Sequence, residues 1–188
     1  SAAAIASIFG WMNLFARAIG GFWSDWANAR SGLRGRLWCQ VVLLVTEGCL
    51  VITFSFTSTL GGAISVMVVF SIFVQAAEGS TFGIVPYVDS TVVGSVAGLV
   101  GAGGNIGGVC FACLFVYNSY QRTFLWMGCI VVASAIWTVF VAIPGHRSLF
   151  TGIDSDDVVE HRQNTKPPAV IMIPTDAGNA EGEEPMSA

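Results

Sequence analysis

The pattern of apolar positions divides most of the chain into five long runs that are separated by short polar segments. A helix needs about 20 predominantly apolar residues to cross the hydrocarbon core of a bilayer. Pro86 follows the third run and Pro144 follows the fifth, at places where helices typically end. The pattern therefore predicts an all-α, polytopic membrane protein with five transmembrane helices, in the runs 2–23, 37–56, 63–85, 92–116 and 124–143.

The placement of arginine predicts the orientation of these helices. If successive helices alternate in direction, the polar segment 24–36, which we expect to form a loop, lies on the same side as the end of the fifth run. The opposite side carries only Arg122. Because cytoplasmic loops carry an excess of Lys and Arg, the loop and the C-terminal tail are predicted to be cytoplasmic. The arginines on that side are Arg30, Arg34, Arg36 and Arg147.

Composition narrows the class of protein. Hydrophobic residues make up 54% of the 188 residues and charged residues 11%, with a mean hydropathy of +0.69. A soluble domain has about 25% charged residues, so a soluble globule is excluded. The sequence pI of about 4.9 and the lack of a basic stripe also argue against nucleic-acid binding.

The charges divide the chain into two parts. Residues 1–153 hold six Arg and four acids, a net charge of +2, whereas residues 154–188 hold eight acids and two bases, a net charge of −6. We therefore expect a transmembrane region at 1–150 and an acidic, disordered tail at 151–188. No basic segment or cleavage site precedes the first run, so we expect the interior of a longer protein rather than a signal peptide.

Arg17 lies inside the first run, where a guanidinium costs about 3 kcal/mol on insertion scales. Such a residue typically faces a watery cavity and finds a partner, although an arginine at this depth can also extend its side chain to the interface. Small and polar residues share its helical face, at spacings of three and four, which favours an anion site. These residues are Gly10, Asn13, Gly20 and Gly21.

The fourth run carries seven glycines, although each glycine in a helix costs about 0.5–1 kcal/mol relative to alanine. Small residues allow two membrane helices to touch, and a mid-span Asn105 can act as a polar contact between them. The same face can alternatively bring bare backbone amides and a carboxamide against a small planar anion, and the two interpretations are compatible. The face consists of Gly94, Gly98, Gly101, Asn105 and Gly108.

Two acids, Glu47 and Glu78, lie within the predicted helices. Transporters use such residues as proton relays. A neutral or hydrogen-bonded carboxyl group that ties helices together is an equally good interpretation of each residue. Glu78 shares a helical face with Ser71, Gln75 and Phe82.

Catalytic and metal-binding patterns are missing from the sequence. His146 and His161 lie outside the apolar runs without paired ligands, and no Ser/His/Asp set, phosphate-binding loop or HExxH motif occurs. The five cysteines lie in apolar runs, and Cys110-x-x-Cys113 has no second ligand pair to complete a zinc site. We therefore predict that the chain is not an enzyme and holds no metal or cofactor.

Four segments form a distinctive combination: NLFARAIGG (13–21), SGLRGRLW (31–38), AAEGSTFGIVPYV (76–88) and GLVGAGGNIGG (98–108). Together they resemble the nitrate/nitrite porter family of the major facilitator superfamily, and in particular its eukaryotic high-affinity nitrate transporters. The resemblance covers residues 2–126. Gly21, Asp25 and Arg34 also resemble the superfamily's cytoplasmic-loop motif, with Trp26 in place of the usual basic residue.

The resemblance implies a twelve-helix transporter in which these runs are helices 8 to 12. It implies that Arg17 is one of two arginines that clamp nitrate, the other lying in an N-terminal half outside this chain. It also matches a glycine-rich family signature to Gly101, Gly104, Asn105 and Gly108.

These observations predict part of a plasma-membrane transporter that moves nitrate, and nitrite with it, by alternating access. The expected partners are nitrate or nitrite, the lipid bilayer and the missing N-terminal half, and the sequence leaves open an accessory membrane subunit. One alternative is a facilitator of another small or organic anion. A second alternative, from a different class, is a membrane sensor or assembly subunit that transports nothing.

Overall fold

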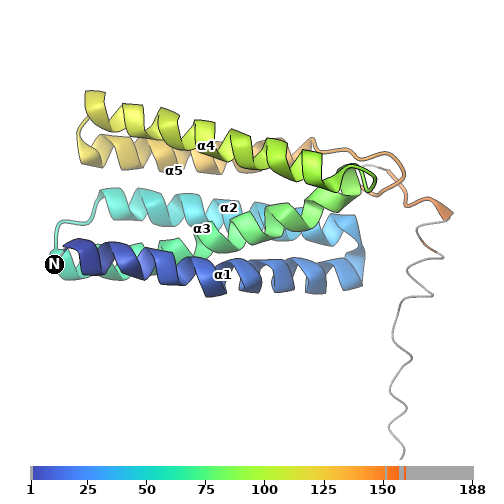
Figure 1. Ribbon diagram of the computed structural model, residues 1–188, viewed down its shortest axis with the longest axis horizontal. Coiled ribbons are helices and arrows are strands. Elements are labelled where there is room, and N and C mark those ends of the chain that lie inside the picture. The colour runs from blue at the N-terminus through green and yellow to red at the C-terminus, as the bar shows by residue number, and fades with distance from the viewer. Residues whose placement is uncertain (1, 151, 157–158, 160–188) are drawn as a thin grey trace, which may run out of the picture. The chain divides into compact units, whose positions relative to one another are not determined.

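Helices account for most of the chain, and their bounds follow the apolar runs (Figure 1). The computed structural model describes residues 2–150, 152–156 and 159, with side chains from Phe15 onward. Residues 1–155 form one compact unit, whereas most of the predicted tail at 151–188 lies outside the described residues. The helices are α1 (Ala2–Ser31), α2 (Leu33–Ser55), α3 (Leu60–Val88), α4 (Val93–Tyr117) and α5 (Tyr120–Val139).

The junction between α1 and α2 differs from the prediction, because the polar segment 24–36 is helical apart from one residue. Residues 24–31 contain no Gly or Pro, so nothing interrupts α1 before Gly32. Gly32 has a φ of 62°, a left-handed conformation that glycine adopts at little cost, and it alone separates the two helices. At 1.5 Å per residue α1 is about 45 Å long, which exceeds the roughly 30 Å of a bilayer's hydrocarbon core.

The ends of α3 and α5 are also displaced from the predicted positions. α3 continues through Pro86 to Val88, since a proline in the last turn removes only one of the final hydrogen bonds. α5 begins at Tyr120 and ends at Val139, where the backbone N–H of Phe140 donates to the carbonyl groups of Trp137 and Thr138. Residues 140–143, predicted as helix, form the turn that leads to Pro144.

Within the described residues, four helices are long and apolar enough to cross a membrane: α2, α3, α4 and α5. The first predicted span also forms a helix, α1, although it is not one of these four. The helices alternate in direction along the bundle, so the end of α1, the start of α2 and the end of α5 lie together, away from the start of α5 (Figure 1). In the sequence, Arg30, Arg34 and Arg36 lie near the α1–α2 junction, Arg147 follows α5, and Arg122 lies at the start of α5. The protein is therefore a multi-pass helical membrane protein.

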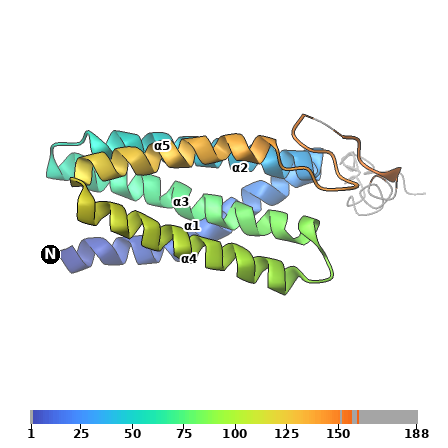
Figure 2. The same ribbon diagram turned by 90° about the horizontal axis from the view of Figure 1, so that it is seen from above.

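The five helices do not pack equally. α2 lies against α1, α3 and α5, and α1 also packs along α3. α4 contacts only α3 and α5 (Figure 2). No residue of α4 is buried, whereas α2 and α3 each bury several, so α4 is the least enclosed helix of this unit.

The buried apolar residues gather where α2 meets its neighbours. One cluster lies at the arginine-rich end, where Leu33 and Leu37 of α2 pack against Ile143 and Leu149 of the segment that follows α5. A second cluster lies nearer the middle of the bundle, between Leu43 of α2 and the pair Ala76 and Ala77 of α3. The first cluster holds the start of α2 and the end of α3 against the chain beyond α5, and the second joins the middle of α2 to α3.

Candidate functional site

The crossing of α1 and α3 is the tightest contact between helices near Arg17. Gly20 lies against the backbone of Ala76, and Gly79 lies against the carbonyl group of Arg17 and the amide of Gly21. A Cβ atom at either glycine would overlap main-chain atoms that cannot move aside. The two glycines therefore fix how closely the backbones of α1 and α3 approach one another.

An ion pair joins the two helices beside this crossing. The Nη2 atom of Arg17 contacts Oε1 of Glu78, which immediately precedes Gly79 in the chain. Both side chains are 42% exposed, so the pair opens onto the surface of this unit rather than into its core. The guanidinium also lies 5.7 Å from the centre of the Phe82 ring.

Arg17 keeps hydrogen-bonding capacity in this arrangement. Its Nε atom is buried and has no hydrogen-bond partner within the described part of the chain. A guanidinium carries five N–H donors in a planar fork, which suits the geometry of a planar oxyanion. The site can therefore bind a small anion, provided that the anion shares or displaces the contact with Glu78.

The sequence analysis identified Arg17 and Glu78 separately and missed that they are partners. The predicted face of α3 divides, because Ser71 and Gln75 are buried while Glu78 is half-exposed. The two charges lie 61 residues apart in the chain, so no local spacing could have joined them. Opposite charges in two apolar runs were the one available signal of a pair.

The structure does not bring the other predicted anion-binding residues to Arg17. α4 does not contact α1, and Asn105 is exposed together with Gly101, Gly104 and Gly108. A Cβ atom added at any of these three glycines would meet nothing within 4 Å. The side chain of Asn13 lies outside the described residues. The role of these residues in anion binding stays a prediction.

Glu47 is separate from the ion pair. It lies on α2, half-buried, and makes no hydrogen bond or ion pair within the described residues. Gly48, the next residue, packs against Val132 and Gly128 of α5. The structure therefore connects Glu78 to the candidate anion site and leaves Glu47 without such a connection.

An ion pair lies at the arginine-rich end, beside the residues of the predicted cytoplasmic-loop motif. Asp25 of that motif pairs with Arg36, at 2.6 Å between Oδ1 and Nη2. The Nη1 atom of Arg36 donates to Ser24 Oγ at 3.0 Å, and Gly83 leaves the space that this guanidinium occupies. Only 9% of Arg36 is exposed, so it is the buried charge that holds this end of α1, α2 and α3 together.

An aromatic contact extends this cluster to the segment after α5. The guanidinium of Arg36 lies 5.5 Å from the centre of the Tyr87 ring. The Tyr87 hydroxyl donates to Asn28 Oδ1 at 2.8 Å, and the ring of His146 meets Tyr87 edge to face at 5.1 Å. The sequence analysis did not single out Tyr87 or Asn28, since neither residue stands out in an apolar pattern.

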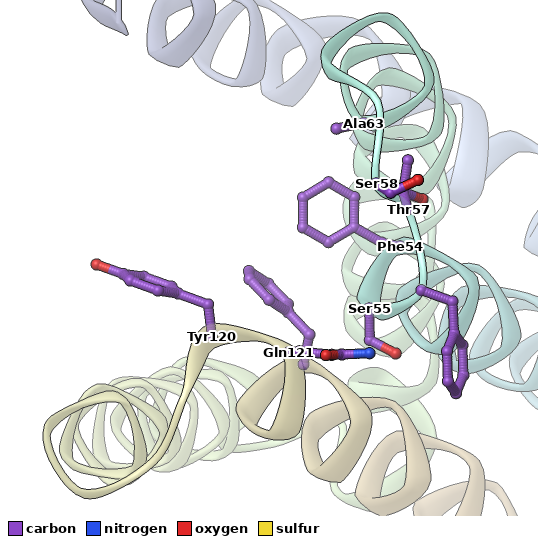
Figure 3. Close-up of a pocket in the computed structure, with 9 residues that line it drawn as sticks. Phe54, Ser55, Thr57, Ser58, Ala63, Tyr120 and Gln121 are labelled. Atoms are coloured by element: carbon purple, nitrogen blue, oxygen red, sulfur yellow. The ribbon is translucent and has the colours of Figure 1, made fainter.

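A pocket of about 490 Å³ lies at the opposite end of the bundle, between the α2–α3 turn and the start of α5 (Figure 3). Aromatic rings and small polar groups line it, without a charged side chain. It is therefore less suited to an anion than the surroundings of Arg17. The lining residues are Phe54, Ser55, Phe56, Thr57, Ser58, Ala63, Tyr120, Gln121 and Phe124.

Comparison with known proteins places the chain among named nitrate transporters. It is 39% identical over 163 residues to High affinity nitrate transporter 2.5 of Arabidopsis thaliana, covering 85% of this chain and 32% of the relative. It is 38% identical over 160 residues to Nitrate transporter 2.2 of Chlamydomonas reinhardtii, covering 80% and 31%. It is 42% identical over 114 residues to the Nitrate/nitrite transporter NrtP of Picosynechococcus sp., covering 59% and 20%.

The chain spans about a third of the length of the first two of these relatives. No family model matches the chain, and no solved structure matches it. The similarity nevertheless extends over about 80% of the chain. The chain belongs to the nitrate/nitrite porter family of the major facilitator superfamily.

Proposed function

We propose that the chain forms part of a membrane transporter that carries nitrate, and nitrite with it, by alternating access. The observation that carries this proposal is the half-exposed guanidinium of Arg17, which lies at the α1–α3 crossing and whose one ion pair among the described residues is with Glu78. Charge-assisted hydrogen bonds from such a group suit a trigonal oxyanion. The names of the relatives support nitrate as that anion.

We assign the remaining site residues as follows. Asn13, Gly101, Gly104, Asn105 and Gly108 line the anion path together with residues that lie outside this chain. The exposed glycine face of α4 supports this assignment, because it leaves room for an anion or another helix to approach the backbone. Glu47 and Glu78 are the groups proposed for proton coupling.

Replacement of Arg17 by lysine tests the proposal. Lysine keeps the charge and loses the planar fork, so we expect nitrate uptake by the full-length protein that carries this chain to fall at least a hundredfold. Uptake of labelled nitrate is measured in cells that lack their own nitrate transport, at equal surface abundance. Arg30→Lys is the matched control, since Arg30 stacks on Trp26 at the end of α1. Normal uptake affinity in Arg17→Lys would exclude Arg17 as the anion ligand.

The setting in the cell belongs to the same proposal. We assign the protein to the plasma membrane, with the arginine-rich helix ends and the tail in the cytoplasm. The partners that we assign are the bilayer, an N-terminal half that supplies the second arginine, and an accessory membrane subunit. The shared location of Arg30, Arg34, Arg36 and Arg147 at one end of the bundle supports the orientation.

A further inference from the structure

We propose that the carboxylate of Glu78 is a built-in competitor of the transported anion. It occupies donors on Arg17 that the anion needs, and nitrate binds as Glu78 leaves. This inference rests on the proposed function, and it assigns to Glu78 a defined task at that site, which is to set the affinity for the anion and to release it.

The geometry holds the competitor in place. Glu78 precedes Gly79, whose Cα lies against the carbonyl group of Arg17, so the helix crossing fixes the carboxylate beside the guanidinium. A tethered group acts at an effective concentration in the millimolar range or above without any cost of association. A carboxylate and nitrate are both planar anions with oxygen acceptors, so they require the same N–H donors.

The ion pair is also free to open, unlike the second ion pair of this unit. Both partners are 42% exposed, and within the described residues the Arg17 side chain makes no other hydrogen bond or ion pair, although its guanidinium lies near the Phe82 ring. The Arg36 side chain, in contrast, is 10% exposed and is held by both Asp25 and Ser24. The Arg17–Glu78 pair can therefore separate by side-chain rotation alone, without unpacking α1 from α3.

Competition for one guanidinium links the exchange to a proton. With Glu78 ionised, a nitrate at Arg17 would place two mutually repelling negative charges beside the same guanidinium at membrane depth. When a proton from water binds a carboxylate oxygen of Glu78, the ion pair is lost and the freed N–H groups of Arg17 donate to nitrate. Loss of that proton restores the competitor and drives the anion off.

No other charged group in the described part of the chain contacts this pair. On α1 the next charge is Asp25, which is bound to Arg36 of α2. α2 also carries Glu47, whereas α4 carries no charged residue. The remaining titratable groups on the helices that pack against α3 are Arg30 and Arg34 near the opposite ends of α1 and α2, the thiols of Cys39, Cys49, Cys110 and Cys113, and the hydroxyl of Tyr117.

The test replaces Glu78 by glutamine in the full-length protein and measures nitrate uptake from pH 5 to pH 8. If the ion pair leaves Arg17 available about a tenth of the time, removal of the competitor lowers KM about tenfold. We expect the KM of the unaltered protein to fall as the pH falls, and the KM of Glu78→Gln to be low at every pH. We also expect a lower kcat, because nitrate now leaves without a competitor to displace it.

Two further variants complete the test. Glu78→Asp keeps the charge with a shorter reach, so its KM should fall by a smaller factor and keep its pH dependence. Asp89→Asn removes an exposed carboxylate at the end of the same helix and should leave the KM and its pH profile unchanged.

The outcomes separate the inference from the proposed function. If both Glu78 variants reach the membrane at normal abundance and keep the KM and pH profile of the unaltered protein, Glu78 does not compete with the anion. A higher KM with an intact pH slope would also overturn the inference and would leave Glu78 a purely structural partner. If Glu78→Gln fails to reach the membrane, the KM of Glu78→Asp decides. Failure of the unaltered protein to take up nitrate at any pH would remove the proposed function, and the inference with it.

Discussion

Glycines serve two different purposes in this bundle, one at the crossing of α1 with α3 and the other along α4. At the crossing, Gly20 and Gly79 are buried, and a Cβ atom on either would overlap the facing backbone. Along α4, all seven glycines leave open space around the position of a Cβ atom. The glycines at the crossing therefore make a contact between helices within this chain, whereas the glycines of α4 make no such contact.

The number of glycines in a helix therefore does not by itself show where that helix contacts another. The crossing needs only two glycines, because two helices that cross at an angle approach most closely at one point and need small residues only there. α4 spreads its glycines over about four turns, at a cost in helix stability that nothing within the described chain offsets. Its bare face is therefore the surface on which a neighbour from outside this chain is expected.

The largest effect should come from filling the crossing. Gly79→Val places two methyl groups against the carbonyl group of Arg17, so we expect a loss of about 3 kcal/mol in unfolding free energy, the upper end for overpacking. Denaturant titration of the purified chain in detergent, followed by circular dichroism, measures it. Gly61→Val, on the same helix with open space around it, is the control and should lose little. Equal stability of the two variants would show that the glycines at the crossing tolerate a side chain as well as a glycine with open space around it.

A smaller effect of opposite sign is expected on α4. Gly104→Ala should stabilise the purified chain by about 0.5–1 kcal/mol, because alanine is the better helix former and nothing lies near its methyl group. In the full-length protein the same variant should reduce nitrate uptake, because the methyl group enters the proposed contact. A gain in stability with unchanged uptake would mean that the glycine face of α4 contacts nothing in the full-length protein either.

The smallest effect concerns the turn that joins α3 to α4. The carboxylate of Asp89 accepts hydrogen bonds from the backbone N–H and the hydroxyl of Thr91, and these bonds lower the pKa of Asp89. Its contribution to stability is present above the ordinary pKa of about 4 and is lost as the pH falls through the lowered value. Asp89→Asn should therefore make unfolding of the chain slightly less sensitive to pH below about 4. The measurement is a series of thermal melts at different pH values. If Asp89→Asn loses stability below about pH 4 as steeply as the unaltered chain does, the Asp89 carboxylate does not stabilise the turn before α4.

Much of the fold could be predicted from the sequence, because apolar runs of membrane length are a strong signal. The family could be predicted too, since the segments around Arg17, Glu78 and Asn105 are distinctive in combination. The prediction of a loop at 24–36 was wrong. The polar residues of this segment suggested irregular structure, but residues 24–31 contain no helix breaker, so α1 continues as far as Ser31. A polar segment continues a helix when the helix extends beyond the bilayer.

The partners within the site could not be predicted, and the reason is physical. Arg17 and Glu78 meet through a crossing of two helices, and Asp25 chooses Arg36 over Arg34 because the guanidinium of Arg36 fits the space beside Gly83. Both choices depend on the rotation and separation of whole helices. Spacing along one helix reports which residues share a face, but it does not report what that face meets.

The length of α1 has a mechanical consequence at the arginine-rich end. The cluster of Asp25, Arg36, Tyr87 and His146 holds the last turns of α1 against α2 and α3. From Gly20, where α1 crosses α3, about 17 Å of α1 leads to Ser31 and about 27 Å leads back to Ala2. The arginine-rich end is therefore the shorter and more firmly held arm of α1, and a tilt about the crossing would move its N-terminal end further.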